Sequence, residues 1–588
     1  MITDEDISGK VLDHLGLVAT TVEKIGLIEK IDSRLPLTNA KTTMGQRVAA
    51  MIFNGLGFID DRLYMFPQFL SNKPMDRLFK GELQAENFND DALGRCLDSI
   101  YEYGVTKLFS EVAIEIGIEN KLLGKFAHFD TTSLMLYGDY EQPEIEEKTD
   151  FSNSEVSENI LKSDMLAPLS SEQSPKIEEL NIPNSNLAAA DPSANAIPKN
   201  GYSKEHRPDL KQMVLNLATT GSAGFPIWME AHSGNASDKK ILHEAAQRMH
   251  TLCKGIKEAP SFIFVGDSAI YDACLKEAGD MLWITRVPER HKAVKQLLQY
   301  SDDSYAWKAL SDGYKICIVE TEYRGIHQRW AIVYSEHAYQ RECKTLTKNI
   351  LKTEEQLKKN LWHLGNQVFH CESDAQTALD NFSKKFLYHK ISASIIPVLQ
   401  HKGKGRPAKD AQPQVIGYQI SGDLSQDKHK IDTIRNTKGR FILATNQLSR
   451  EDLPDEDILS EYKEQSKTES GFKFIKDNAF EVSSIFLKKP ERIAALMMVM
   501  TLCLMVYAIA QFEFRAALAA AGDTIPSQTK KETSKPSMKW VYRLFQGVQV
   551  ISLTLQGITQ EIVINLKAIQ KKIIRYFGLR AMAIYGIT

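Results

Sequence analysis

The spacing of hydrophobic residues changes along the chain and divides it into regions of different secondary structure. Residues 7–119 repeat apolar positions at helical intervals, broken by loops such as LPLTNAKTT, and they show no run typical of a strand. This pattern predicts an all-α N-terminal domain over residues 1–120.

The following region alternates short apolar runs with helical patterns. A helical stretch covers residues 238–253, and a shorter one ends at Leu275. The apolar runs are, in chain order, KFAHFD, QMVLNLATT, PIWMEAHSG, SFIFVGD and MLWITRV. QMVLNLATT and PIWMEAHSG flank the turn GSAGFP, as the strands of a β-hairpin do. We predict the α/β fold class, with a mixed sheet that contains one antiparallel hairpin and whose first part spans residues 121–287.

One segment inside this region lacks the pattern of a folded element. Residues 141–200 hold 12 acidic and four basic residues, six prolines and a single aromatic residue, Phe151. Burial of so little apolar surface cannot offset the entropy lost on ordering. We therefore predict a disordered acidic insertion.

Beyond Val287 the strand patterns become amphipathic (YKICIVE, RWAIVYS, VIGYQIS) and surround a charged helix over residues 337–364. A buried-strand pattern returns at RFILAT, so we predict that residues 288–438 form a β-rich domain inserted into the sheet. Residues 439–525 then complete the core. Residues 526–588, with ten basic and two acidic residues, are predicted to form a basic helical segment.

An uncharged run of 18 residues, 493–510, is long enough to be a transmembrane helix. It is solitary, rich in Met and Ala, and flanked by the charged helix formers KKPER and EFRAAL. These features favour a buried core helix and no membrane partner.

Composition and charge describe an ordinary globular chain of 588 residues, 43% hydrophobic and 25% charged. A net charge of −3 provides no overall basic field that would indicate nucleic acid. The seven cysteines are scattered without a C-x-x-C pair, which indicates neither a zinc site nor a disulfide framework and fits a reducing cytoplasm.

Three carboxylates lie where a sheet would bring them together. Asp130 ends KFAHFD, Asp267 ends SFIFVGD, and Glu469 lies on a predicted helix after RFILAT. Open α/β sheets place ligands at the carboxyl ends of strands, and clustered carboxylates require a cation such as Mg²⁺ or Mn²⁺. Taken alone, each residue is better explained as a helix cap or a solvated side chain. The three together predict metal-dependent phosphoryl transfer.

The helix with the glutamate carries a motif. Tyr462, Gln465, Glu469 and Lys476 lie within about 60° of one another on an ideal helix. Their spacing resembles Y-x2-R-x3-E-x6-K, the motif of DDE-type insertion-sequence transposases of the IS-four group and its relatives. Gln465 stands where the family has Arg, which removes a charge-assisted phosphate contact.

Further stretches support the resemblance. FDTTS around Asp130 and VGDSAIYD around Asp267 are similar to the two aspartate motifs of the family, and GYSKEHRPDLKQ (residues 201–212) is similar to a subgroup signature, GHSKDHRPDL. The family has a ribonuclease-H-like catalytic core with an inserted β-rich domain before the glutamate, which matches the order of regions predicted above.

The resemblance implies a DNA transposase that hydrolyses the element ends and then joins the 3′-OH to target DNA, a cut-and-paste reaction. It implies two Mg²⁺ (or Mn²⁺) ions, terminal inverted repeats and target DNA as partners, and a nucleoid-associated homodimer on paired ends. The implied catalytic and metal-binding residues are Asp130, Asp267 and Glu469. The implied DNA contacts are Tyr462, Gln465 and Lys476, together with His206 and Arg207, unless Arg207 forms a core salt bridge. His128 is expected to be a packing residue.

Two basic stretches allow two interpretations each. HKGKGRPAK, with Lys404 and Arg406, resembles an AT-hook for the DNA minor groove, or is a solvated loop. LKAIQKKIIRYFGLR is a DNA-backbone face or a membrane-surface helix. The N-terminal helical domain is the candidate reader of the element ends.

Two other functions stay open on the sequence. A metal-dependent ribonuclease-H-like nuclease without strand transfer would share all three carboxylates. A catalytically inactive, transposase-derived DNA-binding protein would have lost one of them, and all three are present.

Overall fold

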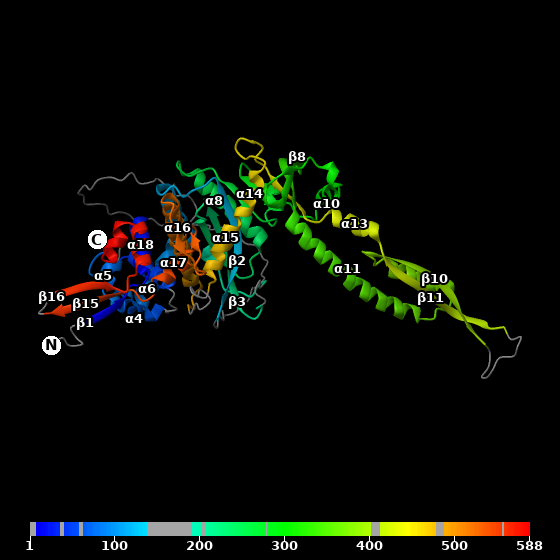
Figure 1. Cartoon of the computed structure of the whole chain (residues 1–588), viewed down its shortest axis with the longest axis horizontal. Coiled ribbons are helices and arrows are strands. Elements are labelled where there is room, and N and C mark those ends of the chain that lie inside the picture. The colour runs from blue at the N-terminus through cyan, green and yellow to red at the C-terminus, as the bar shows by residue number, and fades with distance from the viewer. Residues whose placement is uncertain are drawn as a thin grey trace, which may run out of the picture. The chain divides into compact units, whose positions relative to one another are not determined.

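The computed structural model describes residues 7–35, 40–57, 63–137, 140, 191–202, 207–277, 279–401, 412–477, 487–555 and 558–587. The chain forms two compact units (Figure 1). Unit 1 comprises residues 1–273, 279–281 and 464–588, and unit 2 comprises residues 274–278 and 282–463.

The sheet of unit 1 mixes antiparallel and parallel pairing. Its strands, in the order β4–β3–β2–β5, are β2 (Phe126–Leu136), β3 (Lys211–Thr220), β4 (Phe225–Ser233) and β5 (Ile263–Gly266). β2 and β4 both pair antiparallel with β3, whereas β5 runs parallel to β2. The mixed sheet and the β3–β4 hairpin confirm the predicted α/β class. α8 (Asp238–Lys254) follows β4, and α9 (Tyr271–Glu277) follows β5.

Unit 1 also contains one long apolar helix, α16 (Pro490–Ala520), and several shorter helices. They are α1 (Leu15–Lys24), α2 (Leu27–Asp32), α3 (Met44–Leu56), α4 (Phe66–Ser71), α5 (Met75–Leu78), α6 (Asp90–Tyr103), α7 (Val105–Glu119), α15 (Ser466–Ile475), α17 (Met538–Leu544), α18 (Ala568–Phe577) and α19 (Leu579–Ile584). α3 begins with a capping box between Thr43 and Gln46, and the side chain of Asn89 caps α6.

α16 is long and apolar enough to cross a membrane by length and composition, but 89% of its apolar window is buried inside the protein. α1, α3, α6, α7 and β4 contact it. A helix that is apolar all round has to be covered all round, and these elements cover it. The prediction of a core helix is confirmed.

Both chain ends differ from the prediction. β1 (Ile7–Val11) pairs antiparallel with β15 (Gln549–Leu555), which pairs with β16 (Ile558–Ile564), so the N-terminal region is not all-α and the C-terminal segment is not all helical (Figure 1). Two short strands, β13 (Ile525–Pro526) and β14 (Glu532–Thr533), precede them. The partner of β1 lies more than 500 residues away, and local periodicity carries no information about it.

The end of the predicted acidic insertion is ordered, contrary to the expectation of disorder over residues 141–200. Asp191 accepts hydrogen bonds from the backbone N–H of Ser193 at 2.9 Å and of Thr106, in the first turn of α7, at 3.0 Å. Lys199 then pairs with Gln212 next to β3. Residues 141–190 lie outside the described residues.

Unit 2 is built on antiparallel strands in the order β6–β12–β9–β8–β7. Its strands are β6 (Leu282–Arg286), β7 (Lys308–Ala309), β8 (Tyr314–Tyr323), β9 (Ile326–Ser335), β10 (His389–Gln400), β11 (Gln414–Gln426) and β12 (Arg440–Thr445). Its helices are α10 (Lys292–Leu298), α11 (Glu336–Gly365), α12 (Glu372–Ser383), α13 (Lys428–Asn436) and α14 (Asp457–Glu464), whose last residue is assigned to unit 1.

The inserted domain is smaller than predicted. β8 and β9 were expected inside it, but β9 pairs with β12 along its whole length, so both strands extend the sheet of β12. The insertion proper is α11, α12, the β10–β11 hairpin and α13, with α11 lying against β11 (Figure 1). An amphipathic strand pattern does not reveal which sheet a strand joins.

Candidate active site

β2 and β5 bring the two predicted aspartates to adjoining positions. His128 on β2 is opposite Val265 on β5 in a parallel register, and Asp130 and Asp267 each follow two residues later. Asp267 directly follows β5, which ends at Gly266, so the register brings positions 130 and 267 next to each other on neighbouring segments of the chain. Asp130 is half-buried and accepts the N–H of Thr131 at 2.8 Å, whereas Asp267 is exposed and accepts that of Ala269 at 2.6 Å.

α15 is bonded to β2 directly beside Asp130. The Thr468 hydroxyl donates to the carbonyl of His128 at 3.1 Å and lies 2.7 Å from the Thr219 hydroxyl on β3. The Gln465 amide donates to the carbonyl of Phe129 at 3.3 Å. The bonds reach two consecutive carbonyls, so they determine both the position and the register of α15 on the strand.

The same packing determines which residues of α15 stay accessible. Thr468 is completely buried and Gln465 is 9% exposed, whereas Glu469 is exposed. Glu469, the third predicted carboxylate, therefore directly follows Thr468, the residue that bonds α15 to the strand of Asp130. Ile475 and Phe472 complete the buried side of the helix, and Phe474 lies against Tyr507 of α16 in a tilted arrangement, with ring centroids 4.5 Å apart.

The three carboxylates are not closed into a metal cage. Among the described residues, no group of three His, Cys, Asp or Glu side chains is close enough to hold a metal ion. The structure brings Asp130 and Asp267 to adjoining positions and places Glu469 on the helix bonded to β2. Carboxylate oxygens are the ligands that Mg²⁺ and Mn²⁺ prefer, so the donor types present fit such an ion.

The predicted continuous helical face is interrupted. α14 ends at Glu464 and α15 begins at Ser466, and the buried side chain of Gln465 points away from the accessible side that carries Glu469. Lys476 is the C-cap of α15 and is half-buried. Tyr462 is half-buried on α14 and belongs to unit 2.

His128 is a packing residue, as expected. Its side chain is 4% exposed, and burial lowers its pKa to about 4, so it is neutral at pH 7. It lies on the same face of β2 as Asp130 but cannot contribute a positive charge near a phosphate.

The remaining predicted DNA contacts are only partly within the described residues. Arg207 is exposed and forms a bidentate pair with Asp209, with nitrogen–oxygen distances of 2.7 and 2.9 Å, so it does not form a core salt bridge. His206, Lys404 and Arg406 lie outside the described residues. In the basic C-terminal segment, Lys572 pairs with Asp523 and Arg580 with Glu23, each at 2.7 Å, which reduces the charge available to DNA.

Sequence reasoning missed a buried ionic network behind the site. Glu230 on β4 is completely buried, accepts two hydrogen bonds from Arg248 of α8 at 2.8 and 2.9 Å, and lies 2.8 Å from His232. Burial by itself raises the pKa of the Glu230 carboxyl, but the bonds from His232 and Arg248 outweigh it and hold that pKa below its ordinary value. No local pattern connects these residues, and Thr468 was missed for the same reason.

The fold is an α/β protein whose mixed sheet brings two aspartates to adjoining positions, as metal-dependent phosphoryl transfer requires. Residues 185–506, more than half of the chain, match the family described as Transposase DDE domain. The chain therefore belongs to the DDE transposases and is an enzyme of DNA transposition, which confirms the resemblance to DDE-type transposases. Members of this family use divalent metal ions. The match includes Asp267 and Glu469, and Asp130 precedes it.

Other comparisons add less. Residues 7–114 match the Domain of unknown function DUF4277. A comparison with curated proteins gave no match. Among solved structures, a cryo-EM structure of a piggyBac transposase synaptic complex with hairpin DNA shows 9% identity, covering 90% of this chain and 79% of that chain, with a TM-score of 0.33. A TM-score this low does not establish a shared fold.

Proposed function

We propose that this transposase moves an insertion sequence by a cut-and-paste reaction on a ribonuclease-H-like core, with Asp130, Asp267 and Glu469 as its catalytic carboxylates. The observation that supports the proposal is the parallel register of β2 and β5, which brings positions 130 and 267 next to each other, with α15 bonded to the carbonyl of His128 on β2. Repulsion between two nearby carboxylates raises the free energy of the folded protein unless a cation or a proton neutralises them.

The reaction is two phosphoryl transfers. In the first, a water oxygen attacks the phosphorus at the element end, the bond from phosphorus to the 3′ oxygen breaks, and that oxygen takes a proton to become the 3′-OH. In the second, the 3′-OH attacks a phosphorus of the target strand, and the released target oxygen takes the proton. Two Mg²⁺ or Mn²⁺ ions, when bound, supply the Lewis acidity for both transfers.

The side chains of this structure have separate parts in that reaction. Asp130 and Asp267 present oxygens from the sheet, and Glu469 presents its carboxylate from the accessible side of α15. Lys476 and Tyr462 would hold DNA phosphates as a point charge and a hydrogen-bond donor. Gln465 acts differently from the arginine of the family motif, because its amide is used on the carbonyl of Phe129.

The same chemistry implies the partners. The substrate DNA consists of the terminal inverted repeats and the target, and joining two ends to one target requires two active sites. We therefore propose that a homodimer assembles on paired ends.

The test is a cleavage and joining assay with the element's terminal DNA in Mg²⁺ or Mn²⁺. Wild type should nick the end and join it to target, and Glu469→Gln should do neither. Glu451→Gln is the matched control, because Glu451 is an exposed glutamate in the turn before α14. Cleavage without joining would indicate the nuclease, and metal-independent end binding without cleavage would indicate a DNA-binding relic.

Metal ligation is tested by changing the ligand atom. In Asp130→Cys and Asp267→Cys the hard oxygen is replaced by a softer sulfur, which Mn²⁺ accepts better than Mg²⁺ does. Activity should be lost in Mg²⁺ and partly return in Mn²⁺. Equal loss in both metals would argue against direct ligation by these residues.

A further inference from the structure

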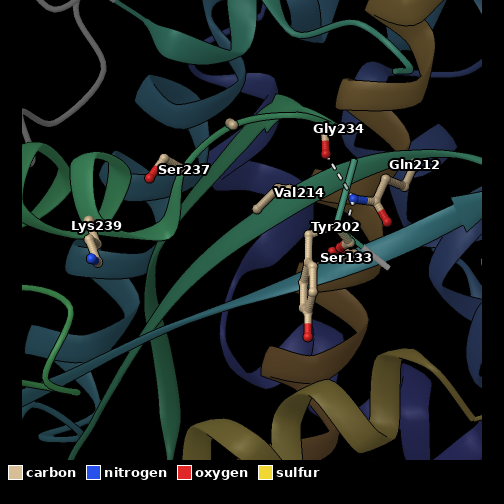
Figure 2. A pocket seen from close by; sticks show the side chains of 8 residues that line it. Ser133, Tyr202, Gln212, Val214, Gly234, Ser237 and Lys239 are labelled. Atoms are coloured by element: carbon tan, nitrogen blue, oxygen red, sulfur yellow. Dashed lines mark hydrogen bonds between the residues drawn. The ribbon is translucent and has the colours of Figure 1, made fainter. Parts of the chain in front are cut away.

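A cavity of about 280 Å³ opens in unit 1 beside the start of α8, three residues beyond Asp130 along β2 (Figure 2). Ser133 of β2, Ser237 and Lys239 at the start of α8, and Tyr202 are among the residues that line it. None of these residues takes part in the carboxylate site.

Two hydroxyls of the cavity have no partner within the described residues. Ser133 is only 9% exposed, yet its hydroxyl makes no hydrogen bond there. Ser237 is the N-cap of α8, but its side chain makes no capping bond. Buried hydroxyls are normally hydrogen-bonded, so a polar ligand is expected where Ser133 lines the cavity.

The charge beside these hydroxyls is positive. Lys239 is exposed and forms no ion pair among the described residues, whereas its neighbour Lys240 lies 3.8 Å from Glu244. Residues 237–240 read SDKK, a formal charge of +1. The N-terminus of the 17-residue helix α8 adds a partial positive charge and N–H groups with no partner inside the helix.

An aromatic ring stands at the same cavity. Tyr202 is 85% exposed, and Figure 2 shows its side chain beside Ser133. The backbone there is held in place, because the Gln212 amide donates to the carbonyl of Tyr202 at 3.2 Å and to that of Gly234 at 2.8 Å. An exposed ring next to a cation and hydroxyl donors is the combination that binds the backbone and a base of a DNA strand.

We propose that this cavity binds a backbone phosphate of DNA. Lys239, Ser237 and Ser133 hold the phosphate, and Tyr202 packs against the adjoining sugar or base. The inference rests on the proposed function, since it assumes DNA at the carboxylates. Ser133 follows Asp130 by roughly 10 Å of strand and, three residues on, lies on the opposite face of β2, so a DNA strand bound at the carboxylates reaches the cavity by passing the end of the sheet. The cavity is slightly below the range of about 300–1,000 Å³ typical of small-molecule sites, which suits one phosphate and its sugar.

The experiment measures the affinity of the full-length chain for terminal DNA as a function of KCl concentration. Losing one phosphate contact lowers the slope of log K against log salt by about 0.9. Lys239→Met should show that loss. Lys240→Met is the matched control, since it removes a lysine from the next position of the same helix and should leave the slope unchanged. Ser133→Ala should weaken binding several-fold with an unchanged slope.

Two results would overturn the proposal. One is an equal slope for Lys239→Met and wild type. The other combines two observations: inorganic phosphate at matched ionic strength stabilises the wild type but not Lys239→Met, and the two proteins have the same salt slope for DNA binding. The cavity would then bind free phosphate and not DNA. The cleavage assay with Glu469→Gln tests the proposed function separately from the phosphate site. If wild type cleaves and joins DNA while the salt slopes of wild type and Lys239→Met are equal, only the phosphate-site proposal is refuted. If Lys239→Met has the lower salt slope but the wild type does not cleave DNA, only the proposed reaction is refuted.

Discussion

Thr468→Val tests whether the bonds between α15 and β2 position Glu469, the proposed catalytic glutamate. Valine keeps the shape of threonine and removes the hydroxyl, which is completely buried and bonded to His128 at 3.1 Å and Thr219 at 2.7 Å. Each such bond contributes a net 0.5–1.5 kcal/mol, so the local stability of α15 should fall by about 2 kcal/mol. At 1.36 kcal/mol per factor of ten, this is roughly 30-fold.

The assay is hydrogen exchange at the backbone amides of α15, which reports local opening. In Thr468→Val these amides should exchange roughly 30-fold faster than in wild type. End cleavage should fall about tenfold or more, because Glu469 is the next residue and small displacements of a reacting group cost rate steeply.

Thr501→Val is the control for this prediction. Thr501 is just as buried, but its hydroxyl bonds only to the carbonyl of Met497 within α16. It should leave exchange in α15 and cleavage unchanged. Unchanged exchange in α15 of Thr468→Val would refute the view that the hydroxyl holds the helix, and faster exchange with full cleavage would refute its link to Glu469.

Three further predictions concern buried groups. Gln465→Arg restores the residue of the family motif, but it should lower cleavage and leave the salt slope of DNA binding unchanged. The reason is that position 465 is 9% exposed and that the Gln465 amide donates to the carbonyl of Phe129. A slope higher by about 0.9 would instead show a new phosphate contact. The pKa of His128 falls from 6.5 in the unfolded chain to about 4 in the folded protein, so the free energy of unfolding decreases as pH falls below 6.5. Between pH 7 and pH 5, urea titrations should show a decrease about 2 kcal/mol smaller for His128→Leu than for wild type. Equal decreases would contradict the pKa shift. Glu230→Gln removes the buried partner of Arg248, whose side chain is 22% exposed and still lies 3.7 Å from Glu244, and should lower the free energy of unfolding by about 3 kcal/mol in a urea titration. A change below about 1 kcal/mol would show that Glu244 or water neutralises the arginine.

Local patterns predicted the elements of the core well. Alternation and apolar runs identified β2, β3, β4, β5 and β12, and RFILAT coincides with β12 at both ends. The long helix α11 and the core helix α16 followed from their periodicity and uniform hydrophobicity. These features are properties of a few neighbouring residues, so the sequence carries them without reference to the fold.

Strand ends and motif spacing predicted the two aspartates and the glutamate as candidate site residues, but not how Glu469 is supported. The helix pattern placed Gln465 and Glu469 on one face, and the structure separates them because Gln465 turns to a carbonyl of β2, more than 300 residues earlier in the chain. A hydrogen bond to a distant carbonyl leaves no periodic trace in either segment.

The sequence by itself determined the order of the elements, the core helix and the identity of the candidate carboxylates, because each depends on residue type and local spacing. Only the tertiary structure decided that β1 joins β15, that β8 and β9 extend the sheet of β12, and that Thr468 and Gln465 bond α15 to the strand of Asp130. Such pairings depend on which distant segments bury each other's apolar surface and pair each other's backbone groups. They therefore depend on the fold of the whole chain and not on local residue spacing.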